Sequence, residues 1–150
     1  MIYIGSENRK EIEKVRRALE TRGLTSHLND TKWRSLCVAI ADELPFPPPY
    51  QVKLVLADTP QPEVLEAAPT YHGDWATTPE AAMGIFIEWL KIAPRVSVSR
   101  GRLVAPRLDD CSASLRDILK RLRIPFSEED GFFIVHGHTA SSEAILTSAV

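Results

Sequence analysis

Two pairs of residues in this chain have types and a spacing that suit metal binding. His136 and His138 lie two residues apart, so on a strand both imidazoles would project from the same face. His72 and Asp74 have the same spacing and would supply a third and a fourth ligand. Such a site would make the chain a metal-dependent hydrolase. However, the two pairs are far apart in the sequence and Gly137 is placed to break the strand, so we expect no metal ion and no other cofactor.

Other catalytic chemistries need spacings that this sequence does not supply. A metal-dependent nuclease places an acidic residue and a lysine on one face of a strand, whereas a spacing of three puts Glu88 and Lys91 on opposite faces. Cys111 lies beside Asp109 and Asp110, whose negative charges oppose the formation of a reactive thiolate. The sequence has no glycine-rich phosphate-binding loop. We therefore expect that the protein is not an enzyme.

A basic helix face is a third feature that can be connected with a function. Within residues 113–123, four basic side chains lie opposite an apolar stripe. Such a face would suit a nucleic-acid-binding regulator. Charged helix faces are more commonly only solvated, and the net charge of the chain is −2, so we expect no direct binding of nucleic acid. The four residues are Arg116, Lys120, Arg121 and Arg123.

The spacing of the apolar residues predicts three helices. The first follows Asn8 and ends before Gly23, and its apolar stripe would make a homodimer contact if it were not packed on the domain. The second begins near Asn29 and stops at Pro45, because proline cannot donate a backbone hydrogen bond. The third is the basic helix, with Ser112 as its cap.

Alternating apolar residues and turn signals predict the strands. Arg100-Gly101 and Asp130-Gly131 each favour a hairpin. The order of elements indicates an α+β fold, in which an antiparallel sheet of about four to five strands carries two to three helices on one face. The expected strands are residues 1–4, 51–57, 85–92, 95–99 with 102–105, and 125–127 with 132–136.

The length of 150 residues and the hydrophobic content of 44% fit one globular domain. We expect an N-terminal strand and helix extension at 1–28, a core domain at 29–138 and a frayed tail at 139–150. The apolar runs are too short to span a bilayer, and the N-terminus has no signal-peptide core. We therefore expect a cytoplasmic protein without membrane contact, in which Cys37 and Cys111 are reduced.

Residues 54–90 form an acidic segment without a single Lys or Arg, although the chain contains 18 such residues. The ends of the segment are predicted strands, so the unexplained part is a proline-punctuated loop from Asp58 to Glu80. Tyr71 and Trp75 are candidate aromatic anchors for a partner, and burial of Trp75 in the core is the alternative. The predicted partner-binding residues are Asp58, Glu63, Glu66, Tyr71, Asp74, Trp75 and Glu80.

Four blocks of the sequence resemble a known family. They read NDTKWRSL, FIEWLKI, PRLDDCSASLRDILKRLRIPF and EEDGFFIVHGH, at residues 29–36, 86–92, 106–126 and 128–138. Over residues 29–138 the chain is similar to small, uncharacterised bacterial single-domain proteins, which in turn look similar to immunity proteins encoded beside toxins. The resemblance implies an inhibitor and supplies no catalytic residues.

The partner that this resemblance implies is a cognate toxin or effector protein. The more specific expectation is a type VI secretion effector with nuclease activity. Toxins that attack nucleic acid present a cationic substrate cleft, and an acidic surface with aromatic anchors complements such a cleft. We therefore expect an immunity protein whose acidic loop binds the toxin.

Overall fold

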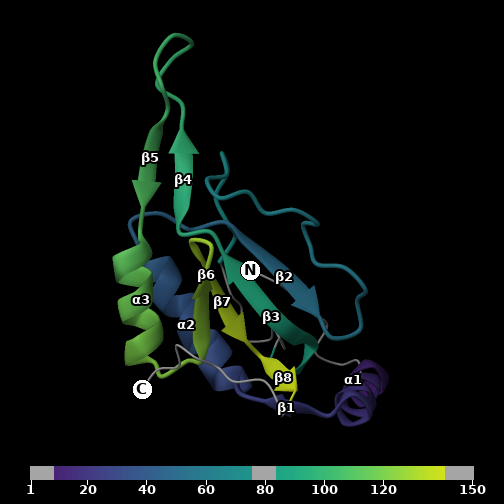
Figure 1. The fold of residues 1–150 in the computed structure, drawn as a ribbon. Helices are drawn as coiled ribbons and strands as arrows, with labels where there is room; N and C mark the ends of the chain where they lie inside the picture. Colours follow the sequence, from purple (N-terminus) through teal and green to yellow (C-terminus); the bar gives the residue numbers. More distant parts are fainter. Residues whose placement is uncertain (1–8, 76–83, 141–150) are drawn as a thin grey trace.

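A four-stranded antiparallel sheet with helices on one face forms the body of the protein (Figure 1). The computed structural model describes residues 9–75 and 84–140. The sheet contains β2 (Tyr50–Leu54), β3 (Ile87–Ile92), β6 (Phe126–Glu129) and β7 (Phe132–His136), and the helices are α2 (Asp30–Glu43) and α3 (Ser112–Arg121). The strand order is β2-β3-β7-β6. This confirms the α+β class, although four further strands form two separate ribbons.

The core lies between the sheet and these two helices. In α2, Trp33 and Leu36 are fully buried, as the spacing predicts. The Asn29 side chain accepts a hydrogen bond of 2.8 Å from the backbone N–H of Lys32, so Asn29 caps this helix. Leu115 of α3 joins the same apolar cluster. None of the helices in the described ranges is long and apolar enough to cross a membrane.

A two-stranded ribbon connects segments from near the two ends of the chain. β1 (Leu24–Ser26) pairs antiparallel with β8 (His138–Ala140). The sequence placed β1 in an extension and Thr139 in a frayed tail, and this expectation differs from the structure. Strands of three residues give almost no alternation of apolar and polar side chains, so the pattern does not mark them. The ribbon fastens the first part of the chain to the body.

Two histidines hold this ribbon. The Nε2 atom of His27 lies 2.6 Å from the hydroxyl of Thr139. The ring nitrogens of His138 lie 2.8 Å from Ser26 Oγ and 2.9 Å from the carbonyl oxygen of Ile85. A carbonyl only accepts, so Nε2 of His138 donates to Ile85 and Nδ1 is free to accept from Ser26. The neutral imidazole of His138 satisfies both contacts.

Acidification is expected to destabilise the protein through these histidines. Burial lowers the pKa of His27, and burial is also the main reason that the pKa of His138 lies below its ordinary value of 6.5. The unfolded chain therefore binds protons more tightly than the folded chain. The histidine contribution to the free energy of unfolding is fully present above about pH 6.5 and is lost as the pH falls through the folded pKa values.

Urea unfolding at about pH 7.5 and about pH 5.5 measures this effect. The free energy of unfolding should be lower at the acidic pH, and the variant His27→Gln should show a smaller loss between the two pH values. Equal losses in the variant and in the original chain would contradict the assignment to His27.

Helix α1 (Arg9–Arg22) packs against η1 (Gly84–Phe86), the short 3-10 helix before β3. Val15 lies at the centre of this contact and is fully buried. At the end of α1, both terminal nitrogens of Arg22 donate to the Glu88 carboxylate at 3.0 Å. The apolar stripe of α1 is covered within the chain, so it does not offer the homodimer contact that the sequence left open.

A two-stranded ribbon also projects away from the body (Figure 1). It consists of β4 (Arg95–Val98) and β5 (Arg107–Asp110), which pair antiparallel. The sequence predicted a tighter hairpin with a return strand at 102–105. Instead, residues 99–106 form an unpaired tip, which ends at Pro106, a residue without a backbone N–H. We call residues 95–110 the arm.

Candidate functional site

The chain that leaves β2 turns back along that strand. We call residues 55–75 of this connection the acidic loop. Val52 of β2 and Gln61 of the loop exchange two backbone hydrogen bonds of 2.9 and 2.8 Å. The side-chain amide of Gln51 donates to the carbonyl oxygens of Pro62 and Glu63 at 2.8 and 3.0 Å. The middle of the loop is therefore fixed to the edge of the sheet.

The next part of the acidic loop has an apolar anchor. Leu65 is buried in a small cluster with Ala93 and Phe132, beside the end of β3 and the start of β7. Further along, the carbonyl oxygen of Pro69 accepts a hydrogen bond of 2.8 Å from the backbone N–H of Ser97 in the arm. These contacts hold the loop against both the body and the base of the arm.

Trp75 fastens the far end of the loop, and it is not the exposed anchor that the sequence allowed. Its side chain is only 2% exposed. The indole N–H donates to the carbonyl oxygen of Pro48 at 2.7 Å, and the ring packs edge-on against Tyr50 at 4.8 Å between centroids. The buried indole N–H needs an acceptor, and the proline-rich turn before β2 supplies one. Trp75 is therefore removed from the predicted partner-binding residues.

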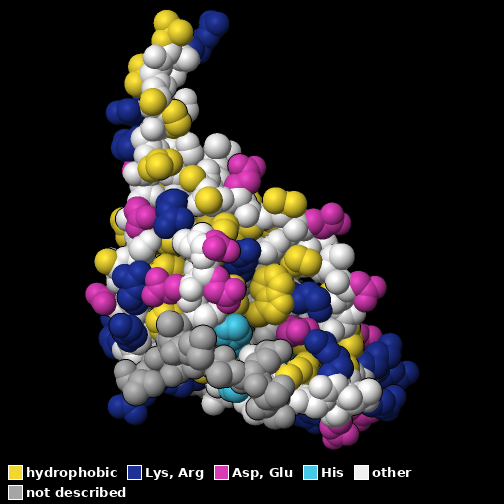
Figure 2. All heavy atoms as spheres, viewed as in Figure 1, with side chains coloured by type: hydrophobic (Ala, Val, Ile, Leu, Met, Phe, Trp, Pro, Cys, Tyr) yellow, Lys and Arg dark blue, Asp and Glu magenta, His cyan; other side chains and the backbone are white. Residues whose placement is uncertain are grey.

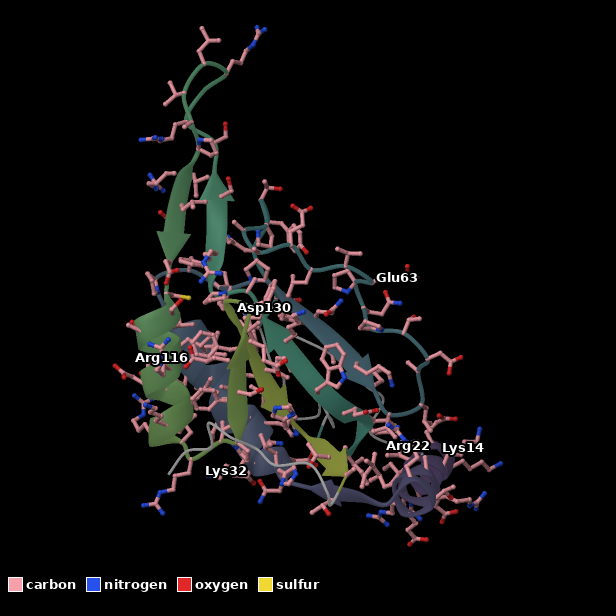
Figure 3. The ribbon with its side chains drawn as sticks, viewed as in Figure 1. Lys14, Arg22, Lys32, Glu63, Arg116 and Asp130 are labelled. Atoms are coloured by element: carbon pink, nitrogen blue, oxygen red, sulfur yellow. The ribbon has the colours of Figure 1, made fainter. Side chains whose placement is uncertain are left out.

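Three carboxylates of the acidic loop are exposed and have no ion-pair partner among the described residues. Within the residues that the structure describes, Asp58, Glu63 and Glu66 make no salt bridge. Figure 3 shows Glu63 on the loop outside β2. In contrast, arginines hold the carboxylates of Glu43 and Glu128 elsewhere on the surface. The loop thus presents uncompensated negative charge.

Exposed apolar side chains accompany this charge. Val64 is 74% exposed, Tyr71 49% and Leu56 44%. Large apolar side chains on a charged surface are typical of sites that bind other proteins. Tyr71 was predicted, whereas Leu56 and Val64 were missed. The available signal was the run Glu63-Val64-Leu65-Glu66, in which two acidic residues flank an apolar pair and only one of the pair, Leu65, is buried.

The two remaining predicted residues have different outcomes. Asp74 is exposed, and its carbonyl oxygen accepts a hydrogen bond of 2.9 Å from the hydroxyl of Tyr50. Burial raises the pKa of Tyr50 to about 12, so the phenol keeps the proton that it donates. Glu80 lies outside the described residues. The loop therefore brings Asp74 to the surface with Asp58, Glu63, Glu66 and Tyr71.

The residues of the alternative metal site are not brought together. His72 stacks on Phe46 with 6.1 Å between ring centroids, while His136 lies 2.9 Å from the hydroxyl of Ser127. His138 is 3% exposed and engaged in the ribbon. In residues 9–75 and 84–140, no three His, Cys, Asp or Glu side chains form a group that could hold a metal ion.

The basic helix face is partly neutralised within the chain. Arg116 makes two hydrogen bonds of 2.7 Å to Glu128, and Figure 3 shows its side chain extending from α3. Arg121 makes two to Glu43, at 2.8 and 2.6 Å. Hydrogen bonding to these arginines holds the pKa of both glutamates below their ordinary value. Two of the four predicted cations are thus paired, which weakens the case for a nucleic-acid surface on α3.

Residues 15–142 match the model of a family of unknown function, DUF6678. The matched range begins within α1 and includes the acidic loop, the arm and both strands of the β1–β8 ribbon. No curated protein and no solved structure matches the chain.

Proposed function

The chain belongs to the family of unknown function DUF6678, and we propose that it is a non-enzymatic binding protein that neutralises a bacterial toxin. In this proposal it is a cytoplasmic immunity protein, and its toxin is a type VI secretion effector with nuclease activity. The resemblance of four sequence blocks to proteins similar to immunity proteins supports the proposal. The acidic loop is the surface that binds the toxin.

The observation that carries the proposal is the combination of charge and apolar surface on the acidic loop. Asp58, Glu63 and Glu66 have no ion-pair partner in the described chain, and Val64 and Tyr71 lie exposed near them in the sequence. A cationic substrate cleft would pair with these carboxylates, and its apolar walls would cover the exposed side chains. Occlusion of the cleft would prevent the entry of nucleic acid.

The fixed shape of the loop also favours tight binding. A mobile loop loses conformational entropy when it binds, and this cost weakens the complex. Here the Val52–Gln61 bridge, the buried Leu65 and the buried Trp75 hold the loop before any partner arrives. The toxin would therefore meet a surface that needs little rearrangement.

Charge reversal on the loop is expected to weaken toxin binding strongly. The double variant Glu63→Lys and Glu66→Lys should lower the affinity by about a hundredfold, because like charges would face each other across the interface. Adding Asp74→Lys should lower it further. The measurement is isothermal titration calorimetry against the purified protein encoded by the neighbouring gene.

A matched control reverses the same number of charges elsewhere. Glu13 and Glu20 are exposed on α1, so the double variant Glu13→Lys and Glu20→Lys should bind as the original chain does. If the loop variants bind with unchanged affinity, the acidic loop is not the binding surface. If a pull-down from the host recovers no toxin and cells expressing the neighbouring gene are not protected, the proposed function is wrong.

A further inference from the structure

The arm exposes three large apolar side chains. Leu103 is 99% exposed, Leu108 60% and Val104 51%. Figure 2 shows hydrophobic side chains together with Lys or Arg side chains along the projecting arm. A two-stranded ribbon with no sheet behind it is only marginally stable in water, and its exposed apolar side chains favour contact with another surface. These properties favour a role for the arm in binding another protein surface.

The charge of the arm restricts which surface it fits. Residues 99–108 contain three arginines and no acidic residue. Arg100 donates to the carbonyl oxygen of Ala105 within the tip, and Arg107 pairs with Asp109 at the base of β5. Arg102 has no ion-pair partner in the described chain. A complementary surface must therefore combine negative charge with exposed apolar side chains.

The acidic loop has both properties. The carboxylates of Glu63 and Glu66, which make no salt bridge within the described residues, flank Val64, which is 74% exposed. Within one chain the arm contacts the loop at its base, where Ser97 donates to Pro69, whereas β4 and β5 direct the tip away from the body (Figure 1). The loop of a second copy can receive it. Contact between two arms is disfavoured because their arginines would repel each other.

We propose that the chain forms a two-fold symmetric dimer in which the arm of each copy docks on the acidic loop of the other. The arm and the loop adjoin where Ser97 donates to Pro69 at 2.8 Å, so both lie on one region of the surface. A two-fold axis repeats the same patch on both subunits, and a patch with one cationic and one anionic half is complementary to itself. The arginines of each arm then face the glutamates of the partner's loop.

This dimer goes beyond the proposed function and does not depend on it. Both use the acidic loop, so a toxin bound to the loop would displace the arm of the second copy. The two ideas fail separately. A monomeric chain that binds a toxin contradicts only the dimer, whereas a dimer that binds no toxin contradicts only the proposed function.

Sedimentation equilibrium of the full chain tests the dimer. The original chain should show a monomer–dimer equilibrium, and its dissociation constant should increase with salt because exposed charges are screened. The double variant Arg100→Glu and Arg102→Glu should weaken the dimer by about a hundredfold. Leu103→Asp, which leaves the contact between Arg100 and Ala105 in place, should weaken it as well. The control Glu13→Lys and Glu20→Lys should leave it unchanged.

A mixture of two variants gives the sharpest result. The arm variant Arg100→Glu, Arg102→Glu and the loop variant Glu63→Lys, Glu66→Lys should each be monomeric alone. Mixed in equal amounts, they should form a heterodimer, because in both contacts a positive surface again faces a negative one. Circular dichroism confirms that each variant is folded.

Three results would overturn the proposal. The first is that the original chain remains monomeric at concentrations up to about 1 mM, a range in which even weak interfaces form. The second is that the arm and loop variants dimerise as strongly as the original chain, which would place the interface elsewhere. The third is that the mixture of the two monomeric variants stays monomeric, which would show that the arm and the loop do not meet.

Discussion

Replacement of Trp75 by alanine is expected to lower the free energy of unfolding by about 3–5 kcal/mol, the usual range for removing a buried tryptophan. The side chain is 2% exposed and belongs to the main core cluster. The substitution leaves a cavity beside Tyr50 and removes the donor that bonds to Pro48 at 2.7 Å. The carbonyl of Pro48 then loses this buried partner, which adds to the cost.

Urea denaturation followed by fluorescence or circular dichroism gives this difference. Tyr71→Ala is the matched control, because that ring is 49% exposed and its loss should change the stability by less than about 0.5 kcal/mol. If the proposed function is correct, the two variants should also differ in binding: Tyr71→Ala should weaken the binding of the proposed toxin without unfolding the protein. A loss below about 1 kcal/mol in Trp75→Ala would mean that the indole does not fasten the loop.

Gly137→Ala is expected to destabilise the protein by about 3 kcal/mol, at the upper end of the range for overpacking. A Cβ atom at this position would lie 2.2 Å from the carbonyl oxygen of Ile87. The backbone cannot move away easily, because Gly137 donates to the carbonyl of Glu88 and accepts from His27, each at 2.9 Å. Relief of the clash would therefore pull the β1–β8 ribbon away from β3.

Gly23→Ala separates this clash from the general cost of replacing glycine. Gly23 has φ of +66° but no heavy atom within 4 Å of the added Cβ, so its replacement should cost only about 1 kcal/mol of backbone strain. Thermal and urea unfolding of both variants give the comparison. If the two substitutions cost the same, the close approach of Gly137 to Ile87 is not rigid.

The elements that the sequence predicts well are those with strong local signals. Helix α2 repeats apolar residues at helical spacing and stops before Pro45, and both features are present in the structure. The β6–β7 hairpin turns at Asp130 and Gly131, where both residues have positive φ, as the Asp-Gly signal requires. In these cases neighbouring residues decide the conformation.

The elements that the sequence mispredicts depend on distant partners. Leu24–Ser26 forms a strand only because His138–Ala140 pairs with it, and no local pattern marks either segment. The arm extends further than expected because Arg107 and Val98 pair across a long tip, a register that the Arg100-Gly101 turn signal does not determine. Pairing of this kind is a property of the whole fold.

The candidate site shows the same division. The absence of basic residues identifies the acidic loop in the sequence, and composition alone predicts that most of its carboxylates are exposed. Burial of Trp75 depends on an acceptor at Pro48, which lies 27 residues earlier, and this contact cannot be read from the segment itself. The exposure of Val64 likewise follows from the side of the loop that Leu65 buries.

The β1–β8 ribbon also has a consequence for synthesis on the ribosome. The side chains of Ser26 and His138, which meet in the ribbon, are separated by 112 positions along the chain. At translation rates of about 5–20 residues per second, β1 leaves the ribosome roughly 5–20 s before its partner exists. Every strand of the four-stranded sheet is complete before β8 emerges. The ribbon thus forms last. In a nascent chain that stops short of His138, β1 has no β8 to pair with, so this contact does not yet attach the segment after α1 to the body.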